Sequence, residues 1–248
     1  MHIKAVLLVL VLPIVTACVT VGGEPMAQNE KASAINVQLG LGYMSQNNLE
    51  QANIKLLRAI NKDPKSASAH NAYAILQERL LENGTAQKHY KIATELDPNN
   101  SEASNNYGAF LCNNGYEKES EKYFLMALKN PLYKTPAYAY TNAARCLLKI
   151  EEKAKAKKYL RKALAVKSNF GNALIEMATI VLDEANFAEA KLYIDRFHLV
   201  DRPTSRSLWL AIRIELGISG SNNVEALGKQ LESEFPNSAE FKSWLALQ

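Results

Sequence analysis

Small and apolar side chains recur along most of the chain with a period of 34 residues. When the sequence is divided into units of this length, position 8 of the first five units is always Gly or Ala, and position 20 is always Ala or Ser. Two antiparallel helices approach closely only where their facing side chains are small, so the pattern predicts helices packed in pairs. Position 24 of the same five units is bulky and would fill the space beside each crossing: Leu56, Tyr90, Phe124, Leu160 and Ile194.

We call the residues at one position of all units a column. The period and the columns resemble the tetratricopeptide repeat, a helix-turn-helix unit. The resemblance implies an all-α protein in which six units stack into a right-handed superhelix, because a single unit cannot bury its apolar face alone. Ile212, Val224 and Gly228 depart from the columns, so the last unit is expected to be atypical. The predicted units are residues 33–66, 67–100, 101–136, 137–170, 171–204 and 205–236.

Residues 237–248 are predicted to form a helix that caps the last unit. Phe241 and Trp244 follow one another at helical spacing and would cover the open apolar face of the stack. A frayed tail is the alternative, and it would leave both aromatic rings exposed. Turns between paired helices are predicted at Asn47-Asn48, Asn83-Gly84 and Asn114-Gly115.

The first eighteen residues are typical of an export signal. Lys4 precedes an apolar run over residues 5–17 that is too short to span a bilayer. The run ends in small residues followed by Cys18, which resembles a bacterial lipobox. We therefore expect a signal peptide over residues 1–17 and a covalent N-acyl diacylglyceride on Cys18. An ordinary secretory signal with an incidental cysteine is the alternative, and a transmembrane anchor is a further one.

Lipidation would hold the mature chain on a membrane, since two or more acyl chains anchor a protein stably. Cys18 is followed by Val19 and Thr20 rather than by Asp, which by resemblance to enteric sorting rules favours the periplasmic face of the outer membrane. Residues 18–32 contain Gly, Pro and polar side chains without an apolar period, so they are predicted to form a flexible tether.

Composition narrows the possible functions. The chain has 248 residues and a net charge of +4, too small by itself to indicate a nucleic-acid partner. It contains none of the short phosphate-loop, zinc-protease, serine-hydrolase or dithiol motifs, and its four His and three Cys are not spaced as metal ligands. We therefore expect neither an enzyme nor a metal site, and no small-molecule substrate or other cofactor.

Cys112 and Cys146 occupy the first helices of the third and fourth units. These helices would be neighbours in the stack, and an oxidising compartment would permit a disulfide between the two side chains. The alternative is a pair of reduced thiols that pack as small hydrophobic side chains.

A binding groove is predicted along the concave side, where the first helix of each unit lies. The side chains at its apolar N-terminal end are Val37, Leu41, Met44 and Ile75. Amide side chains that could orient a bound peptide are Asn71, Asn105 and Asn106, although some of them could instead bridge helices. The alternatives to a partner site are that the tether folds over this apolar end or that its residues are ordinary core.

A basic segment runs from Lys153 to Lys162 within the second helix of the fourth unit. A solvated convex face accounts for it, and contact with anionic lipid or an acidic partner is the other interpretation.

Local strings make a more specific comparison possible. The run from Asn105 to Cys112, N-N-Y-G-A-F-L-C, and the segment Asn142 to Cys146 resemble the type IV pilus biogenesis lipoproteins of the PilF/PilW family. That resemblance implies a pilotin, which would bind the secretin subunit of the pilus system, bring it to the outer membrane and promote its multimerisation. A periplasmic scaffold that regulates peptidoglycan hydrolases is the alternative function.

Overall fold

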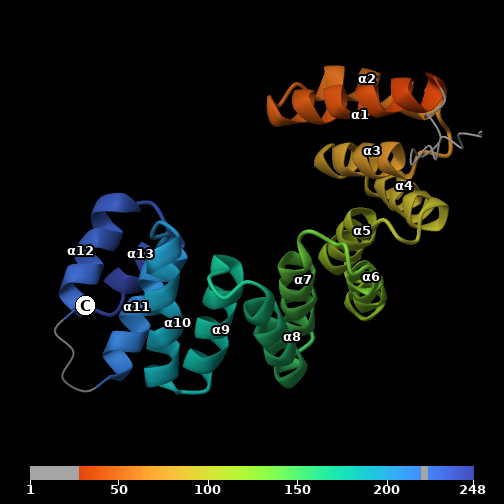
Figure 1. Cartoon of the computed structure of the whole chain (residues 1–248). Helices are drawn as coiled ribbons and strands as arrows, with labels where there is room; N and C mark the ends of the chain where they lie inside the picture. The colour runs from red at the N-terminus through yellow and green to blue at the C-terminus, as the bar shows by residue number, and fades with distance from the viewer. Residues whose placement is uncertain (1–27, 219–222) are drawn as a thin grey trace, which may run out of the picture.

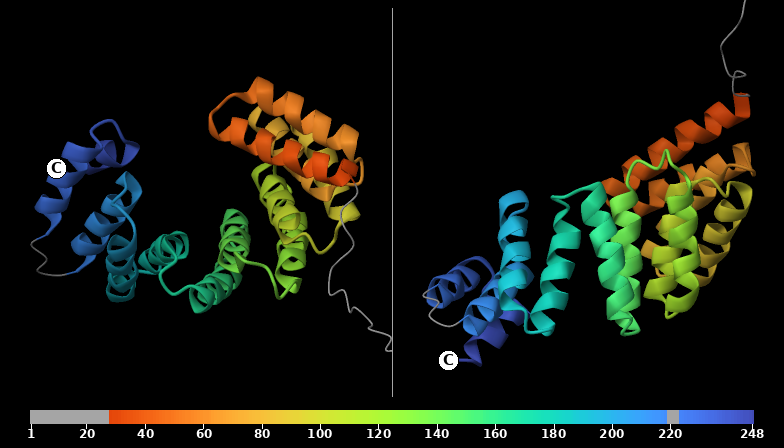
Figure 2. Two further views of the ribbon diagram at one scale, coloured as in Figure 1. Left: turned by 45° about the horizontal axis from the view of Figure 1, so that its top comes forward. Right: turned by 60° about the horizontal axis from the view of Figure 1, so that its bottom comes forward.

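The computed structural model describes residues 28–218 and 223–248, and in this part of the chain all regular structure is helical (Figure 1). Consecutive helices form antiparallel pairs, and the pairs stack into a curved array whose ends lie far apart (Figures 1 and 2). The prediction of an all-α repeat superhelix with a closing helix is confirmed. The helices are α1 (Gln28–Ser45), α2 (Leu49–Lys62), α3 (Ala67–Arg79), α4 (Asn83–Leu96), α5 (Ser101–Asn113), α6 (Glu117–Lys129), α7 (Pro136–Lys149), α8 (Lys153–Val166), α9 (Gly171–Asp183), α10 (Phe187–Val200), α11 (Ser205–Gly217), α12 (Val224–Glu234) and α13 (Ala239–Leu245).

Paired helices approach closely because a small residue on one helix faces a bulky residue on the other, as the columns predict. A Cβ atom added to Gly40 would lie 2.5 Å from Leu56 Cγ, and one added to Gly108 would lie 2.9 Å from the Phe124 ring. Glycine at position 8 therefore leaves room for the bulky residue at position 24 of the same unit. The small residues at position 20 are fully buried at the same crossings.

The turns within units differ from the prediction in one place. Each of the first five units has a left-handed residue at position 15, where the first helix ends; these residues are Asn47, Leu81, Gly115, Glu151 and Ala185. The predicted turn at Asn83-Gly84 is wrong, because α4 already begins at Asn83. The chain reverses two residues earlier, at Leu81, although leucine adopts this left-handed conformation at a cost.

The sixth unit departs from the columns because α13 inserts into it. A Cβ atom on Gly228 would lie 2.5 Å from the Trp244 ring, so glycine at position 24 makes room for the tryptophan. Trp244 and Ile212 join one buried cluster with Leu208 and Leu231. The bulky side chain expected at position 24 is thus supplied by α13.

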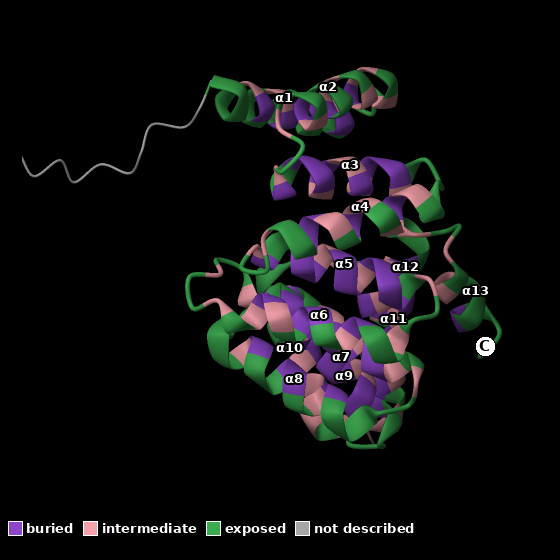
Figure 3. Cartoon of the chain, turned by 90° about the vertical axis from the view of Figure 1, so that its right-hand side faces the viewer, coloured by how far each residue is buried: buried purple, intermediate pink, exposed green. Residues whose placement is uncertain are grey.

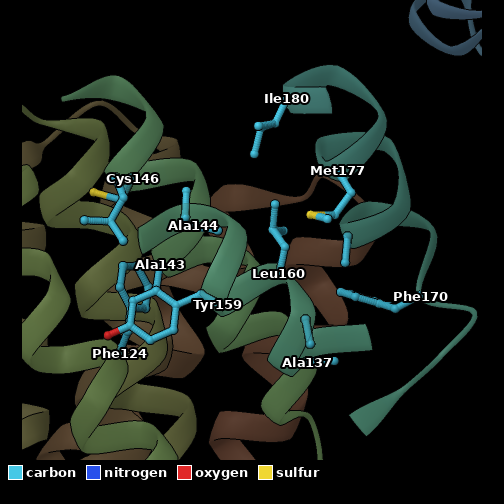
Figure 4. Packing of buried hydrophobic residues seen from close by; sticks show 14 of the residues in the cluster. Phe124, Ala137, Ala143, Ala144, Cys146, Tyr159, Leu160, Phe170, Met177 and Ile180 are labelled. Carbon is cyan, nitrogen blue, oxygen red and sulfur yellow. The ribbon is translucent and has the colours of Figure 1, made fainter. Parts of the chain in front are cut away.

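Apolar contacts run continuously from unit to unit. The largest cluster joins α5 to α9 through side chains such as Phe124, Leu160, Phe170 and Met177 (Figure 4). Alanines at the crossings bring the helices close enough for these larger groups to meet, which is the packing that a stacked array requires.

The predicted tether over residues 18–32 is wrong at its C-terminal end. Helix α1 begins at Gln28, five residues before the expected start of the first unit. Residues 28–32 contain no Gly or Pro, and Glu30 lies in the first turn, where a negative charge interacts favourably with the helix dipole. The rest of the tether, the signal peptide and Cys18 lie outside the described residues. Among the residues that are described, no helix is both long and apolar enough to cross a bilayer.

Candidate protein-docking surface

The apolar groove predicted on the first helix is largely absent. Met44 is buried in the cluster that also holds Leu56 and Leu76, so its prediction as a groove residue is wrong. Val37 belongs to the same cluster but also lines a cavity with Ala34 and Ser68, so its role in binding a partner stays a prediction. Both side chains are buried because α1 packs against both α2 and α3, where small residues at Ala69 and Ala72 allow a close approach. Leu41 is partly exposed, and Ile75 packs against the same cluster as a half-buried side chain.

The asparagines of the concave side connect neighbouring units. The Asn106 side-chain amide donates to Asn71 Oδ1 at 3.3 Å, and the Asn142 amide donates to Asn105 Oδ1 at 3.1 Å. Each bond joins the first helices of consecutive units. The bridging alternative therefore describes these contacts, and a role for Asn71, Asn105 and Asn106 in orienting a bound peptide stays a prediction.

In the C-terminal units, charged side chains connect the first helices in place of asparagines. Glu176 of α9 is buried and accepts hydrogen bonds from Arg206 Nη1 and Nη2 at 3.0 and 2.9 Å, and from Arg145 Nε at 2.8 Å. Burial alone would raise the pKa of Glu176, but its two arginine partners lower it overall. The three residues join α7, α9 and α11 and carry a net charge of +1 on the concave side.

The first helix exposes an apolar strip that the sequence columns could have revealed. Ile35 and Leu39, at positions 3 and 7 of the first unit, are 60% and 44% exposed on α1. We call these two residues the open-end strip. In Figure 3, α1 and α2 lie at one end of the array.

Positions 3 and 7 are covered in the later units by the second helix of the preceding unit. Position 3 there is Ala or Ser and is fully buried, and position 7 is buried in all of these units but the second, where Tyr73 is half-buried. In the part of the chain that the structure describes, no helix precedes the first unit, which carries large aliphatic side chains at both positions. A partner that supplies the missing helix would bury them.

The two cysteines of the repeat region lie together in the core. Cys112 of α5 and Cys146 of α7 are joined by a disulfide, with their Cα atoms 5.7 Å apart. Both are buried in the cluster of Figure 4, where Cys146 is labelled. The bond links the third and fourth units covalently across their shared interface.

Two histidines, of which His70 is buried and His89 half-buried, lie together between α3 and α4. His70 Nδ1 lies 2.8 Å from His89 Nδ1, and His70 Nε2 lies 3.1 Å from the Pro64 carbonyl oxygen. Burial lowers the pKa of both rings, that of His89 to about 4. The described residues contain no group of three or more potential metal ligands, so the pair lacks the further donors of a typical metal site.

The basic segment coincides with α8. Lys155 Nζ lies 2.6 Å from Glu121, and Lys157 Nζ lies 2.6 Å from Glu184, so part of its charge is neutralised by the neighbouring units. Lys162 lies over the rings of Tyr140 and Tyr159 at 5.7 Å. These contacts favour the interpretation of a solvated convex face.

Comparison with known proteins places this architecture in a family. A scan against protein-family models finds no match. The chain is 31% identical over 250 residues to the type IV pilus assembly protein PilF of Pseudomonas aeruginosa, covering 99% of both chains. A solved structure of Pseudomonas aeruginosa PilF superposes with a TM-score of 0.82 at 31% identity, covering 90% of this chain and all of the other.

A second solved structure, of the type IV pilus biogenesis factor PilW, has a TM-score of 0.78 at 30% identity and covers 86% of this chain and 98% of that one. A tetratricopeptide repeat protein from Parabacteroides merdae, at 19% identity and a TM-score of 0.63, shares the fold alone. The full-length match to PilF carries the assignment: the chain belongs to the PilF/PilW family of type IV pilus biogenesis proteins.

Proposed function

We propose that this protein is a pilotin, a lipoprotein of the outer membrane that binds the secretin subunit of the type IV pilus system and promotes its multimerisation. Acyl chains on Cys18 would hold it at the periplasmic face, and the repeats would act as a scaffold without catalytic chemistry. Anchoring one partner raises the local concentration of the other at the membrane.

The open-end strip supports the proposal most directly. Ile35 and Leu39 are exposed on α1, whereas the matching positions of the later units are covered by a helix. Large exposed aliphatic side chains at the end of a stack mark a partner site. Leu41, which is also exposed on α1, stays a predicted groove residue.

The experiment replaces both residues of the open-end strip with glutamate in cells that assemble pili. Charges on this strip should abolish secretin multimers while the protein stays folded and membrane-bound. A matched control is Leu125→Glu on α6, where the leucine is exposed to the same degree as Leu39 but lies on a covered unit. Secretin multimers at the wild-type level in the double variant would refute the docking site.

The anchor requires its own test. Cys18→Ala should release the protein from the membrane fraction and leave the secretin unassembled or in the wrong membrane. Affinity capture from solubilised envelopes then distinguishes the alternatives: recovery of the secretin supports the pilotin, whereas recovery of peptidoglycan hydrolases in its place supports the scaffold function.

A further inference from the structure

The loops that join successive units form a continuous edge of the array. All first helices run in the same direction along the stack, so their N-termini meet at this edge, together with the C-termini of the second helices. Glu30 at the start of α1 lines a cavity with Asp63 and Ser66 of the first joining loop. The Asn130 amide donates to the Asn99 carbonyl oxygen at 3.2 Å and connects the next two loops.

Apolar side chains project from this edge. Leu132, in the loop between α6 and α7, is 83% exposed, and Leu199, at the end of α10, is 84% exposed. Val166, at the end of α8, is about half exposed. Lys134 and Lys167 stand beside them in the sequence, and we call these five residues the loop edge.

The two edges of the array differ in charge. The five loops that join units contain four basic and three acidic residues, a net charge of +1. The five turns within the first five units contain no basic residue and four glutamates, a net charge of −4. An anionic surface would therefore repel the opposite edge, whereas it would tolerate the loop edge and attract its lysines.

The first described residue, Gln28, lies at this same edge. Gln28 begins α1, and in the right-hand view of Figure 2 its end of α1 and the loop between α6 and α7 lie on the same side of the molecule. Only ten positions separate Gln28 from Cys18. A chain of that length spans at most about 35 Å, so an acyl anchor on Cys18 would hold the loop edge near the lipid.

From these observations we propose that the loop edge lies against an anionic lipid bilayer, with Leu132, Val166 and Leu199 in contact with the interface and the lysines among the headgroups. Basic residues mixed with exposed aliphatic side chains are the composition of surfaces that lie on membranes. The inference deepens the proposed function and rests on its acyl anchor. In this orientation the loop edge faces the bilayer, and the open-end strip remains available for the secretin.

The test uses the full, processed lipoprotein reconstituted into vesicles that contain phosphatidylglycerol. A single cysteine, Leu132→Cys or Leu199→Cys, is labelled with an environment-sensitive fluorophore; Cys112 and Cys146 are joined to each other and do not react. Leu81→Cys is the matched control, since Leu81 is 84% exposed but lies in a turn of the opposite edge.

Fluorophores at 132 and 199 should shift their emission to shorter wavelength and be quenched by a lipid-borne quencher, while the one at 81 stays in water. An aqueous signal at all three positions on vesicle-bound protein would overturn the proposal, as would quenching at 81. A shift at 132 and 199 only after secretin is added would also overturn it, because the edge would then be a protein contact.

Failure of the anchor is distinguished by analysing the processed N-terminus for fatty acid. If none is found, the proposed anchor is wrong, and the variants are remade with Cys18→Ala, labelled and mixed with the vesicles directly. Lipid quenching at 132 and 199 would then still support the loop edge, and its absence would overturn it.

Discussion

The arginine pair around Glu176 should contribute measurably to stability, and Arg206→Met tests it. The variant keeps an aliphatic stem but removes two of the three arginine hydrogen bonds to a buried carboxylate, leaving only the bond from Arg145 Nε at 2.8 Å. Breaking a fully buried ion pair costs about 3–5 kcal/mol. Glu176 is buried, but the Arg206 side chain is 44% exposed and Arg145 remains, so we expect a loss of about 1–3 kcal/mol in the free energy of unfolding. Urea titration followed by circular dichroism measures it.

The stability lost in Arg206→Met should depend on pH, because Glu176 accepts these bonds as a charged carboxylate. The pKa of Glu176 in the folded protein lies below its ordinary value of 4.5, so its contribution is present above pH 4.5 and is lost as the pH falls through the folded pKa. The difference between wild type and Arg206→Met should therefore be largest near neutral pH and shrink in acid. Arg206→Lys should not restore it fully, because an ammonium group does not make the same planar pair of bonds.

Arg213→Met is the matched control. Arg213 pairs with Asp183 at 3.4 Å on the same concave side, but both side chains are about 40% exposed. An exposed pair contributes about 0–1 kcal/mol, so this variant should unfold close to wild type. The reasoning would be refuted if Arg206→Met cost no more than the control, or if its cost did not change with pH.

Three further predictions concern stability and use the same urea titrations. Leu81→Gly should stabilise the protein by about 0.5–1 kcal/mol, because the exposed leucine has a φ of 62° and glycine adopts that conformation freely; a loss of stability would contradict this. Replacing Cys112 and Cys146 together by serine should cost about 3–4 kcal/mol in the chain-entropy account, for a bond that spans 34 positions, and reductant should then have no further effect on the variant. The folded-state pKa values of His70 and His89 are lowered, so the unfolded chain takes up protons first, and stability should fall by up to about 1.4 kcal/mol per pH unit and histidine as the pH drops below 6.5. The His89 part should flatten near pH 4, and His89→Gln should remove that part of the slope.

Sequence columns predicted the fold well because they record local packing. Gly40 and Gly108 are small for a reason that the 34-residue period shows, namely the bulky side chain sixteen positions later. The concave groove was harder to predict, because the burial of Val37 and Met44 depends on how α1 packs against α3. Both side chains share a cluster with Ala69 and Ala72 of the next unit, and a rule for the faces of single helices does not consider those neighbours.

The paired side chains on the concave side were not predictable from one helix either. Arg145, Glu176 and Arg206 stand about 30 positions apart and at different places within their units, so no repeat column marks them as partners. Only the superhelical offset between successive first helices brings them together. The open-end strip is the opposite case, since Ile35 stands out in a column that is otherwise Ala or Ser.

The two ends of the array are built differently, and this difference supports a partner at the first unit. At the C-terminal end, α13 adds a helix whose Trp244 packs over Gly228 and closes the apolar face. At the N-terminal end, α1 extends five residues beyond the predicted repeat, yet among the described residues no helix covers Ile35 and Leu39. If α1 served only as a cap, alanine or a polar residue at these positions would give the same packing beneath it without exposing apolar surface. The proposed docking of a second protein at this end would bury both side chains, so charges at Ile35 and Leu39 should disrupt assembly and leave the fold intact.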